Sequence, residues 1–382
     1  MAQLLISGLE DGYRSLLIMN KLNIIKNNII SLKNYYSKKI SLDNKPTYFW
    51  LEPTNHCNLR CIMCPNGAGK IEIEKGYMGY PFYKKIIDEI SEYASTITMA
   101  VHGESVLHPR FFDMVRYATD KSIKVLLNTN ATLIDKKRAE LMLDSGVASI
   151  SFAFDGFDKF VYEKARVGAT YEETLENILY FLKLKKEANK KLPYTVLSVL
   201  MLGLNDYHEE GKGAFLKQFD GLIDEIRIRE VSTWGNTFKE TNDFSFRNNL
   251  LCYPPCSRLW STAVITWNGN VLPCVYNANH EYIIGSLREK SFKEIWNSEK
   301  MLALRKSMLN ESYLQLSPLC ENCIVLGTPP ICGIPAGIRM TLTDSITNIV
   351  GYKFEKFALA AANKIRKGKF SSKTINPIQT NL

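Results

Sequence analysis

The sequence predicts an α/β protein whose main part is a partial (β/α)6 TIM-like barrel, followed by a small α+β unit. Strand-like apolar runs alternate with amphipathic helical segments from residue 47 to about 231. Six such strand–helix units imply parallel strands that are joined by right-handed crossovers. Around residue 252 the pattern changes to short strands on either side of Asn268-Gly269, which is a strong hairpin signal.

The individual elements follow from the same patterns. The strands of the barrel are predicted at 47–52, 97–101, 123–128, 148–154, 194–201 and 224–230. The helices between them are predicted near 80–94, 109–121, 135–145, 159–165, 172–190 and 209–219. The smaller unit is expected to hold a hairpin of 263–267 and 271–273 and a helix over 291–308. Chemistry in such barrels takes place at the C-terminal ends of the strands, so the candidate residues are sought there.

Both ends of the chain combine helical spacing with basic charge. Residues 1–45 hold seven basic and three acidic side chains, and residues 346–382 hold seven basic and one acidic. Amphipathic helices of this kind either pack on the barrel or contact an anionic membrane surface as peripheral elements. We divide the chain into an N-terminal helical extension, the barrel, the smaller domain, and a C-terminal helix with a polar tail, at 1–45, 46–235, 236–335 and 336–382.

The composition narrows the functional class. The net charge is +9, but residues 46–345 carry about −1, so the core lacks the basic stripe of a nucleic-acid enzyme and no nucleic-acid partner is expected. No run of 18 apolar residues predicts a transmembrane helix, and the N-terminal start makes a poor signal peptide. Nine cysteines in close groups indicate metal ligands in a reducing compartment, which predicts a cytoplasmic protein.

Three cysteines directly after the first predicted strand are the most informative motif. Cys57, Cys61 and Cys64 stand as C-x3-C-x2-C. Three closely spaced thiolates can hold three irons of a [4Fe–4S] cluster and leave the fourth iron open to a small molecule. A zinc loop is the alternative, although a structural zinc site usually offers four ligands in paired knuckles. The run resembles the signature of the radical SAM superfamily, in which the open iron binds S-adenosylmethionine (SAM).

This resemblance implies further SAM-binding residues at the ends of the next strands. His102-Gly103-Glu104-Ser105 resembles the Gly-Gly-Glu-Pro element, whose carboxylate receives the SAM amino group, while the glycine lets the backbone approach. His102 and Ser105 depart from that element. The alternative for Glu104 is a solvated loop carboxylate.

Two more motifs follow the third and fourth strands. Asn128-Thr129-Asn130 resembles a Thr-Asn-Gly turn, which places Asn128 near the ribose hydroxyls unless it is a plain Asn-rich turn. Ala153–Gly156 resembles Ser-Leu-Asp-Gly. Arg166 corresponds to a family arginine that binds the SAM carboxylate, and the alternative is an arginine at the end of a surface helix. The implied cofactor-binding residues are Gly103, Glu104, Asn128, Asn130, Asp155 and Arg166.

A second cysteine set comprises Cys256, Cys274, Cys320 and Cys323. Four thiolates from a hairpin and a later C-x2-C knuckle can saturate one cluster, and a zinc ribbon is the alternative. The spacing resembles the auxiliary-cluster region of SPASM and twitch proteins. Val275 stands where many relatives have another cysteine, so we expect one auxiliary cluster and two [4Fe–4S] clusters in all.

The resemblance implies radical chemistry. A low-potential electron donor such as flavodoxin or ferredoxin would reduce the open cluster, and SAM would be cleaved to methionine and a 5′-deoxyadenosyl radical. An auxiliary cluster that accepts an electron favours net oxidation of a small polar substrate, such as a sugar, a cyclitol or a polysaccharide precursor. The alternatives are a peptide or protein maturase that forms thioethers or epimers, and a non-catalytic metal-binding protein.

Candidate catalytic residues are named by position only. His102 is a candidate proton acceptor, and Tyr276 lies beside an expected cluster ligand. Cys252 and Cys332 are either inert buried residues or hydrogen-atom donors to a substrate radical. Arg229 and Trp234 are further candidates for contact with the substrate.

Overall fold

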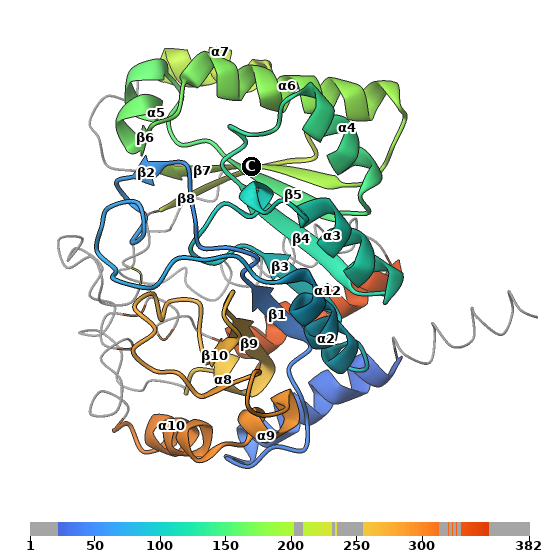
Figure 1. The fold of residues 1–382 in the computed structure, drawn as a ribbon, viewed down its shortest axis with the longest axis vertical. Coiled ribbons are helices and arrows are strands. Elements are labelled where there is room, and N and C mark those ends of the chain that lie inside the picture. Colours follow the sequence, from blue (N-terminus) through green and yellow to red (C-terminus); the bar gives the residue numbers. More distant parts are fainter. Residues whose placement is uncertain are drawn as a thin grey trace, which may run out of the picture.

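A nine-stranded sheet forms the centre of the molecule in this computed structural model (Figure 1). The structure describes residues 22–201, 209–230, 234, 255–312, 320, 323, 326 and 330–350. The strand order is β11-β10-β9-β1-β3-β4-β5-β7-β8. The core strands are β1 (Tyr48–Leu51), β3 (Thr96–Met99), β4 (Lys124–Thr129), β5 (Ser149–Ala153), β7 (Tyr194–Met201) and β8 (Glu225–Glu230). Each is parallel to its core neighbours, which confirms all six predicted barrel strands.

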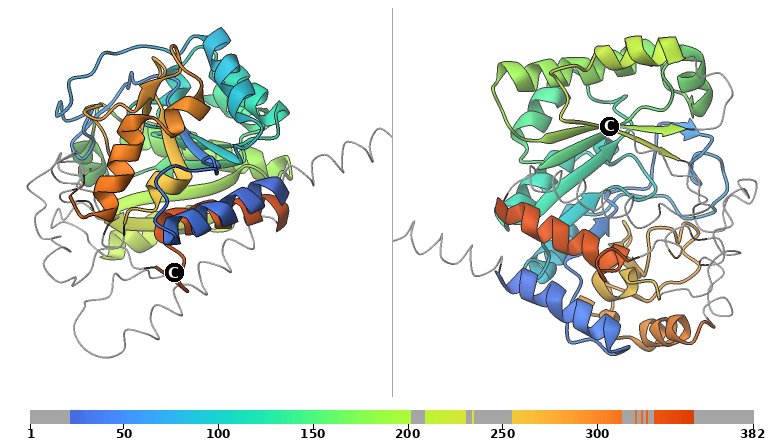
Figure 2. Two further views of the ribbon diagram at one scale, coloured as in Figure 1. Left: turned by 90° about the horizontal axis from the view of Figure 1, so that it is seen from below. Right: turned by 180° about the vertical axis from the view of Figure 1, so that it is seen from behind.

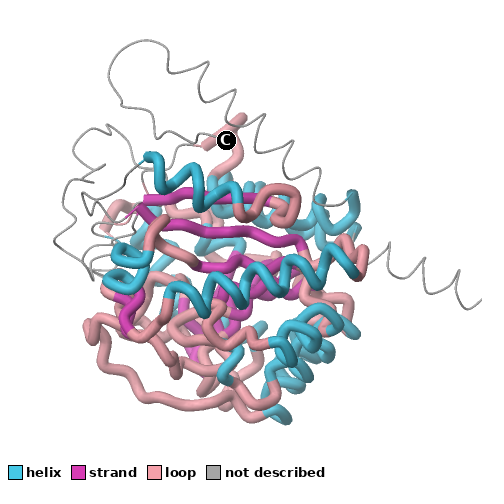
Figure 3. Tube along the Cα trace, turned by 90° about the horizontal axis from the view of Figure 1, so that it is seen from above, coloured by secondary structure: helices cyan, strands magenta, loops and turns pink. Residues whose placement is uncertain are grey.

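Helices connect these strands as the apolar periodicity predicts. They are α2 (Tyr80–Ile90), α3 (Phe111–Asp120), α4 (Lys136–Asp144), α5 (Lys159–Ala165), α6 (Tyr171–Glu187) and α7 (Glu209–Lys217). Figure 3 shows helices running alongside the strands that they connect. A strand presents alternate residues to opposite faces, so Phe49 of β1 packs outward against the ring of Phe292 at 5.1 Å. Trp50 lies on the other face of β1, where it meets Tyr48.

The smaller C-terminal unit continues the same sheet. After α8 (Arg258–Ser261), β9 (Thr262–Ile265) pairs in parallel with β1 and antiparallel with β10 (Asn270–Leu272). Gly269 has a φ of +92°, which suits a glycine in the hairpin turn and confirms the Asn-Gly signal. The last strand, β11 (Gly285–Ser286), pairs with β10. One sheet therefore spans both the barrel and the auxiliary unit.

The helix predicted over 291–308 is wrong as a single element. It is two helices, α9 (Phe292–Trp296) and α10 (Glu299–Leu309). Ser291 forms a capping box with Glu294, and Ser298 accepts a hydrogen bond from the backbone N–H of Met301. The second serine cap starts a new helix because its side chain satisfies a backbone donor at that point.

The helix over residues 22–36 lies beside α12 (Ala336–Val350), as both views in Figure 2 show. Asn28 donates a hydrogen bond to Ser345 Oγ at 2.8 Å, and Ser31 donates to the carbonyl oxygen of Trp260. The helix over 22–36 therefore packs on the rest of the described structure, and it does so through polar side chains. Leu22, Ile29 and Tyr36, which stand at helical spacing in this segment, are exposed.

The basic part of the C-terminal tail, at 351–370, lies outside the described residues. Contact of either tail with an anionic membrane therefore stays a prediction. Within the described ranges, no helix combines the length and the apolar character needed to cross a bilayer.

Candidate active site between two cysteine sets

The first cysteine set occupies a compact loop at the end of β1. Cys57, Cys61 and Cys64 pack with Leu59, Met63 and Ala165 in a small cluster apart from the main core. The short strand β2 (Arg60–Cys61) pairs with β6 (Arg166–Val167) and places Cys61 opposite Arg166. Burial raises the pKa of the Cys61 thiol to about 11. A buried thiolate needs a positive partner, and iron supplies one, so these sulfurs fit an iron–sulfur cluster.

The second cysteine set lines a single cavity. Cys256, Cys274, Cys320 and Cys323 share this cavity with Arg258 and with apolar side chains, namely Leu259, Leu304, Met308 and Leu326. Burial raises the pKa of the Cys256 thiol to about 12. The buried Nη1 atom of Arg258 has no hydrogen-bond partner among the residues that the structure describes. Four sulfur donors, an apolar wall and an adjacent cation fit a negatively charged iron–sulfur cluster.

Glu104 follows β3 and is almost completely buried, which excludes a solvated loop carboxylate. Its oxygens accept hydrogen bonds from Asn130 N at 2.8 Å, Thr129 Oγ1 at 3.0 Å and Val106 N at 3.3 Å. Burial raises the pKa of Glu104, and these hydrogen bonds oppose the rise. The carboxylate is therefore fixed in place at the carboxyl end of the strand, where it is suited to receive an ammonium group.

Gly103 allows a close backbone approach, as the sequence predicts. A Cβ atom there would lie 2.3 Å from the carbonyl oxygen of Thr54 and 2.7 Å from that of His56. The approaching segment is the chain that leads into Cys57, and Glu104 N donates to His56 O at 2.9 Å. Gly103 thus joins the carboxylate loop to the cysteine loop.

The two asparagines after the third barrel strand differ. Asn130 is buried, and its Nδ2 donates to Asn58 Oδ1 at 3.0 Å, beside Cys57. Asn130 therefore positions Glu104 and the cysteine loop. Asn128 lies on β4 and is exposed. Its contact with a ribose stays a prediction.

Asp155 and Arg166 form a buried ion pair of 2.7 Å. Asp155 Oδ1 also accepts a hydrogen bond from Leu200 N at 2.8 Å. This pair holds Arg166 Nη1 3.9 Å from Cys61 Sγ, so Arg166 is not a surface helix-end arginine. Its Nε atom is buried without a hydrogen-bond partner. Contact with the SAM carboxylate stays a prediction.

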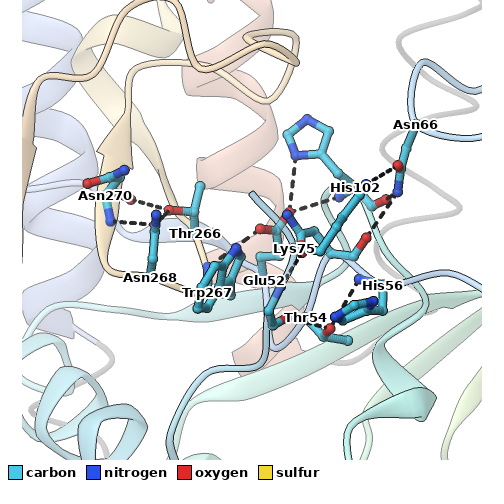
Figure 4. A network of polar contacts seen from close by, with 12 residues as sticks. Glu52, Thr54, His56, Asn66, Lys75, His102, Thr266, Trp267, Asn268 and Asn270 are labelled. Atoms are coloured by element: carbon cyan, nitrogen blue, oxygen red, sulfur yellow. Dashed lines mark hydrogen bonds and ion pairs between the residues drawn. The ribbon is translucent and has the colours of Figure 1, made fainter. Parts of the chain in front are cut away.

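A polar network that the sequence did not reveal surrounds Glu52 at the end of β1 (Figure 4). Glu52 is fully buried and accepts hydrogen bonds from His102 N at 3.1 Å and from its Nδ1 at 3.0 Å. Burial raises the pKa of Glu52, but the hydrogen bonds and charge of His102 outweigh it and lower the pKa below its ordinary value. The only signal in the sequence was the position of Glu52 between a strand and the cysteine loop.

His102 faces a second imidazole from the auxiliary unit. The ring centroids of His102 and His280 are 5.4 Å apart, and the Nε2 atoms of both rings are buried without a hydrogen-bond partner. Burial, followed by the charge of His102, lowers the pKa of His280 to about 4. The site therefore contains two imidazoles with unused nitrogen atoms at the junction of the two units.

Aromatic side chains link the two cysteine sets. Trp234 Nε1 donates to the carbonyl oxygen of Met63, in the first cysteine loop, at 3.1 Å. The ring of Trp234 packs against Tyr276 at 5.8 Å, and Tyr276 N donates to Cys274 Sγ at 3.5 Å. Two sequence candidates are thus brought together between the cysteine sets.

Of the two cysteines outside the two sets, Cys252 and Cys332, the structure describes only Cys332. Cys332 is exposed, so its interpretation as an inert buried residue is wrong. It has a φ of +50° in a turn before α12. Cys252 lies outside the described residues.

Comparisons with known proteins agree with this arrangement. The family model of the radical SAM superfamily matches residues 51–210, and the SPASM model, described as an iron-sulfur cluster-binding domain, matches residues 256–324. The second match favours an iron–sulfur cluster over a zinc ion at the later cysteines.

Curated relatives and a solved structure extend the comparison. The "Tungsten-containing aldehyde ferredoxin oxidoreductase cofactor-modifying protein" of Pyrococcus furiosus is 27% identical, over 72% of this chain and 86% of the relative. The "S-adenosyl-L-methionine-dependent 2-deoxy-scyllo-inosamine dehydrogenase" of Niallia circulans is 24% identical, over 72% and 90%. The structure of BtrN with AdoMet and 2-DOIA is 19% identical, with a TM-score of 0.50 over 75% of this chain and 97% of BtrN. This structural likeness supports the fold.

The cysteine loop, the buried carboxylate and both family matches lead to one assignment. SAM and [4Fe–4S] clusters are the cofactors of such proteins, and the two cysteine sets provide thiol donors for clusters. The chain belongs to the radical SAM superfamily and is an enzyme with a C-terminal SPASM iron–sulfur domain.

Proposed function

We propose that this enzyme oxidises a small polar substrate by abstracting hydrogen from an alcohol carbon. The observation that carries the proposal is the chain of contacts from Met63 through Trp234 to Tyr276, which joins the two cysteine sets around one site. A substrate there would lie within reach of both clusters. The dehydrogenase from Niallia circulans, which matches over most of its length, supports an oxidation.

In this proposal the first cysteine set holds the cluster that binds SAM. Bound together, the cluster and SAM supply the 5′-deoxyadenosyl radical that removes the hydrogen atom. Glu104 accepts the SAM amino group, Arg166 forks onto its carboxylate and Asn128 binds the ribose. Asp155 positions Arg166 for this contact. A small electron-transfer protein, flavodoxin or ferredoxin, is the proposed source of the reducing electron.

His102 acts as the proton acceptor. Oxidation of an alcohol carbon releases a hydroxyl proton as well as the abstracted hydrogen. In the neutral imidazole that this step needs, the hydrogen bond from Nδ1 to Glu52 Oε2 keeps the ring proton on Nδ1. The buried Nε2 is then left as the free acceptor. An auxiliary cluster, which the second cysteine set would hold, would supply the acceptor for the remaining electron. An oxidation returns no hydrogen atom to the substrate, so Cys332 has no step in it.

A substrate screen tests the proposal. Anaerobically reconstituted enzyme with SAM and dithionite is incubated with 2-deoxy-scyllo-inosamine and with a panel of sugars and sugar phosphates. Mass spectrometry then seeks a product that lacks two hydrogen atoms and forms together with 5′-deoxyadenosine. Turnover of a precursor peptide alone would contradict the proposal in favour of a maturase.

His102→Gln should retain iron and SAM cleavage but lose product formation. His108→Gln is the matched control, because His108 is also buried but bonds only locally, with Nε2 near the carbonyl oxygen of Met78 and Nδ1 accepting from Arg110 N. Product formation by His102→Gln at the wild-type rate would remove the proton-acceptor role.

A further inference from the structure

Arg229 lies on the inner face of β8, beside the first cysteine set. Ile226 and Ile228 of β8 pack against the main hydrophobic core, so Arg229 points to the opposite face. Its partner in register on β7 is Leu200. Leu200 packs against the small cluster that contains Cys61. This register places a guanidinium next to the proposed SAM site.

Arg229 makes no hydrogen bond or ion pair with any residue that the structure describes. Its neighbour Arg227, on the same face, is already used, because it forks onto Glu225 with two contacts of 2.7 Å. The Arg229 side chain is exposed to solvent. Partial desolvation by the surrounding protein still lowers its pKa to about 10, and the charge of Arg227 adds to this effect.

A second guanidinium, that of Arg258, lies over the ring of Tyr276. Arg258 stacks over the rings of Tyr276 at 5.6 Å and Trp50 at 5.4 Å. Its Nη1 atom is buried without a hydrogen-bond partner. Tyr276 is also close enough to Arg229 to affect the pKa of that guanidinium. One guanidinium therefore stacks on Tyr276, and the register of β8 on β7 places a second one on the side of the first cysteine set.

We propose that the substrate carries an anionic group, a carboxylate or a phosphate, which Arg229 and Arg258 bind beside Tyr276. This inference rests on the proposed function and names its substrate class. A partly desolvated cation without a partner costs free energy, and the planar guanidinium matches the oxygens of either anion. The enzyme would thus differ from the relative named for an inosamine, since an inosamine carries no anionic group to pair with either arginine.

Equilibrium dialysis with three matched sugars tests the inference. The reconstituted holoenzyme with SAM is dialysed anaerobically against glucose 6-phosphate, glucuronate and glucose. We expect at least one anionic sugar to bind about tenfold or more tightly than glucose, the size of one charged hydrogen bond. The tighter of the two anions distinguishes phosphate from carboxylate. Absence of any anionic preference, whether all three probes bind or none does, overturns the inference.

Variants assign the preference to residues. Arg229→Gln should abolish it, and Arg229→Lys should retain part of it. The control is Arg227→Gln combined with Glu225→Gln, which removes a neighbouring arginine with its carboxylate and leaves net charge unchanged. An anionic preference that survives Arg229→Gln overturns the inference. So does an Arg229→Gln variant that loses affinity for SAM rather than for the sugar.

Iron content and SAM cleavage separate the remaining outcomes. If Arg258→Gln loses auxiliary iron, Arg258 stabilises the cluster and its assignment to the substrate anion is overturned. The Arg229 variants then decide whether Arg229 binds the anion without it. Formation of 5′-deoxyadenosine with dithionite reports the radical chemistry independently. Intact SAM cleavage without anionic preference overturns only this inference, whereas lost cleavage in the wild type overturns the proposed function.

Discussion

The two cysteine sets both provide thiol ligands for an iron–sulfur cluster, but the chain brings their cysteines together in different ways. The first occupies eight consecutive positions, with a bond from Cys64 N to Cys61 O inside the loop, and the pairing of β2 with β6 anchors it to a distant part of the barrel. The second collects sulfurs from the start of α8, the end of β10 and a later knuckle, so its geometry depends on the whole auxiliary unit. The comparison teaches that the sequence of one loop already brings the first set together, whereas the second set is assembled only by tertiary structure.

Removal of the first set should have the largest effect. We expect Cys57→Ala, Cys61→Ala and Cys64→Ala together to remove about four irons and abolish SAM cleavage, because the open iron is lost. Iron analysis and 5′-deoxyadenosine formation measure both. Cys332→Ala, which removes an exposed thiol, is the control and should change neither. Continued SAM cleavage in the triple variant would contradict the assignment of these ligands.

Removal of one auxiliary ligand should separate the two sites. Cys274→Ala should lose about four irons but retain SAM cleavage, because the first set does not depend on the second for its local structure. The unfolding midpoint should also fall, since the cavity walls lose the cluster that binds them together. If SAM cleavage disappears with the auxiliary iron, the two sites are not independent and the comparison fails.

The residues around the first set should affect SAM rather than iron. Glu104→Gln and Arg166→Gln each lose one charged hydrogen bond, which corresponds to roughly ten- to a hundredfold weaker SAM binding. Anaerobic calorimetry without substrate measures the affinity. Glu140→Gln, on the outer helix α4, serves as a control that changes charge away from the site. Wild-type affinity in both variants would make Glu104 and Arg166 structural residues.

The smallest expected effect concerns pH and the auxiliary unit. The pKa of His280 is about 4 in the folded chain and about 6.5 when unfolded, so the unfolded chain binds more protons between these values. Stability is therefore lost as pH falls from about 6.5 towards 4, by about 1 kcal/mol after allowance for partial exposure. Guanidinium unfolding at pH 7 and pH 5 measures the loss, which His280→Gln should reduce. An unchanged pH dependence would show that His280 does not contribute.

Local patterns predicted much of this molecule. Alternating apolar runs predicted all six barrel strands, and the Asn268-Gly269 turn predicted the hairpin. The single helix over 291–308 was wrong because a serine can either continue a helix or cap the next one. Helical periodicity alone could not show which face of the N-terminal helix is buried. Leu22 and Ile29 are exposed, and the helix packs through polar side chains instead.

The site was predicted to the extent that its residues form contiguous motifs. Glu104 and the first three cysteines stand in such motifs. Glu52 was missed because its role depends on His102, fifty positions away, and on the backbone of Trp267 in the auxiliary hairpin. Likewise, Arg258 comes to lie over the rings of Trp50 and Tyr276 only through the fold. Long-range polar networks leave no periodic trace in a sequence.

The parallel pairing of β9 with β1 has a consequence for any attempt to divide the chain. β1 is an interior strand only because β9 lies beside it, with Tyr48 opposite Thr262 and Leu51 opposite Ile265. A fragment that ends before residue 255 would leave the backbone donors and acceptors of β1 as an open edge, ready to pair with another molecule. Such a truncated barrel should aggregate. The auxiliary unit therefore protects the barrel from self-association as well as contributing cysteines.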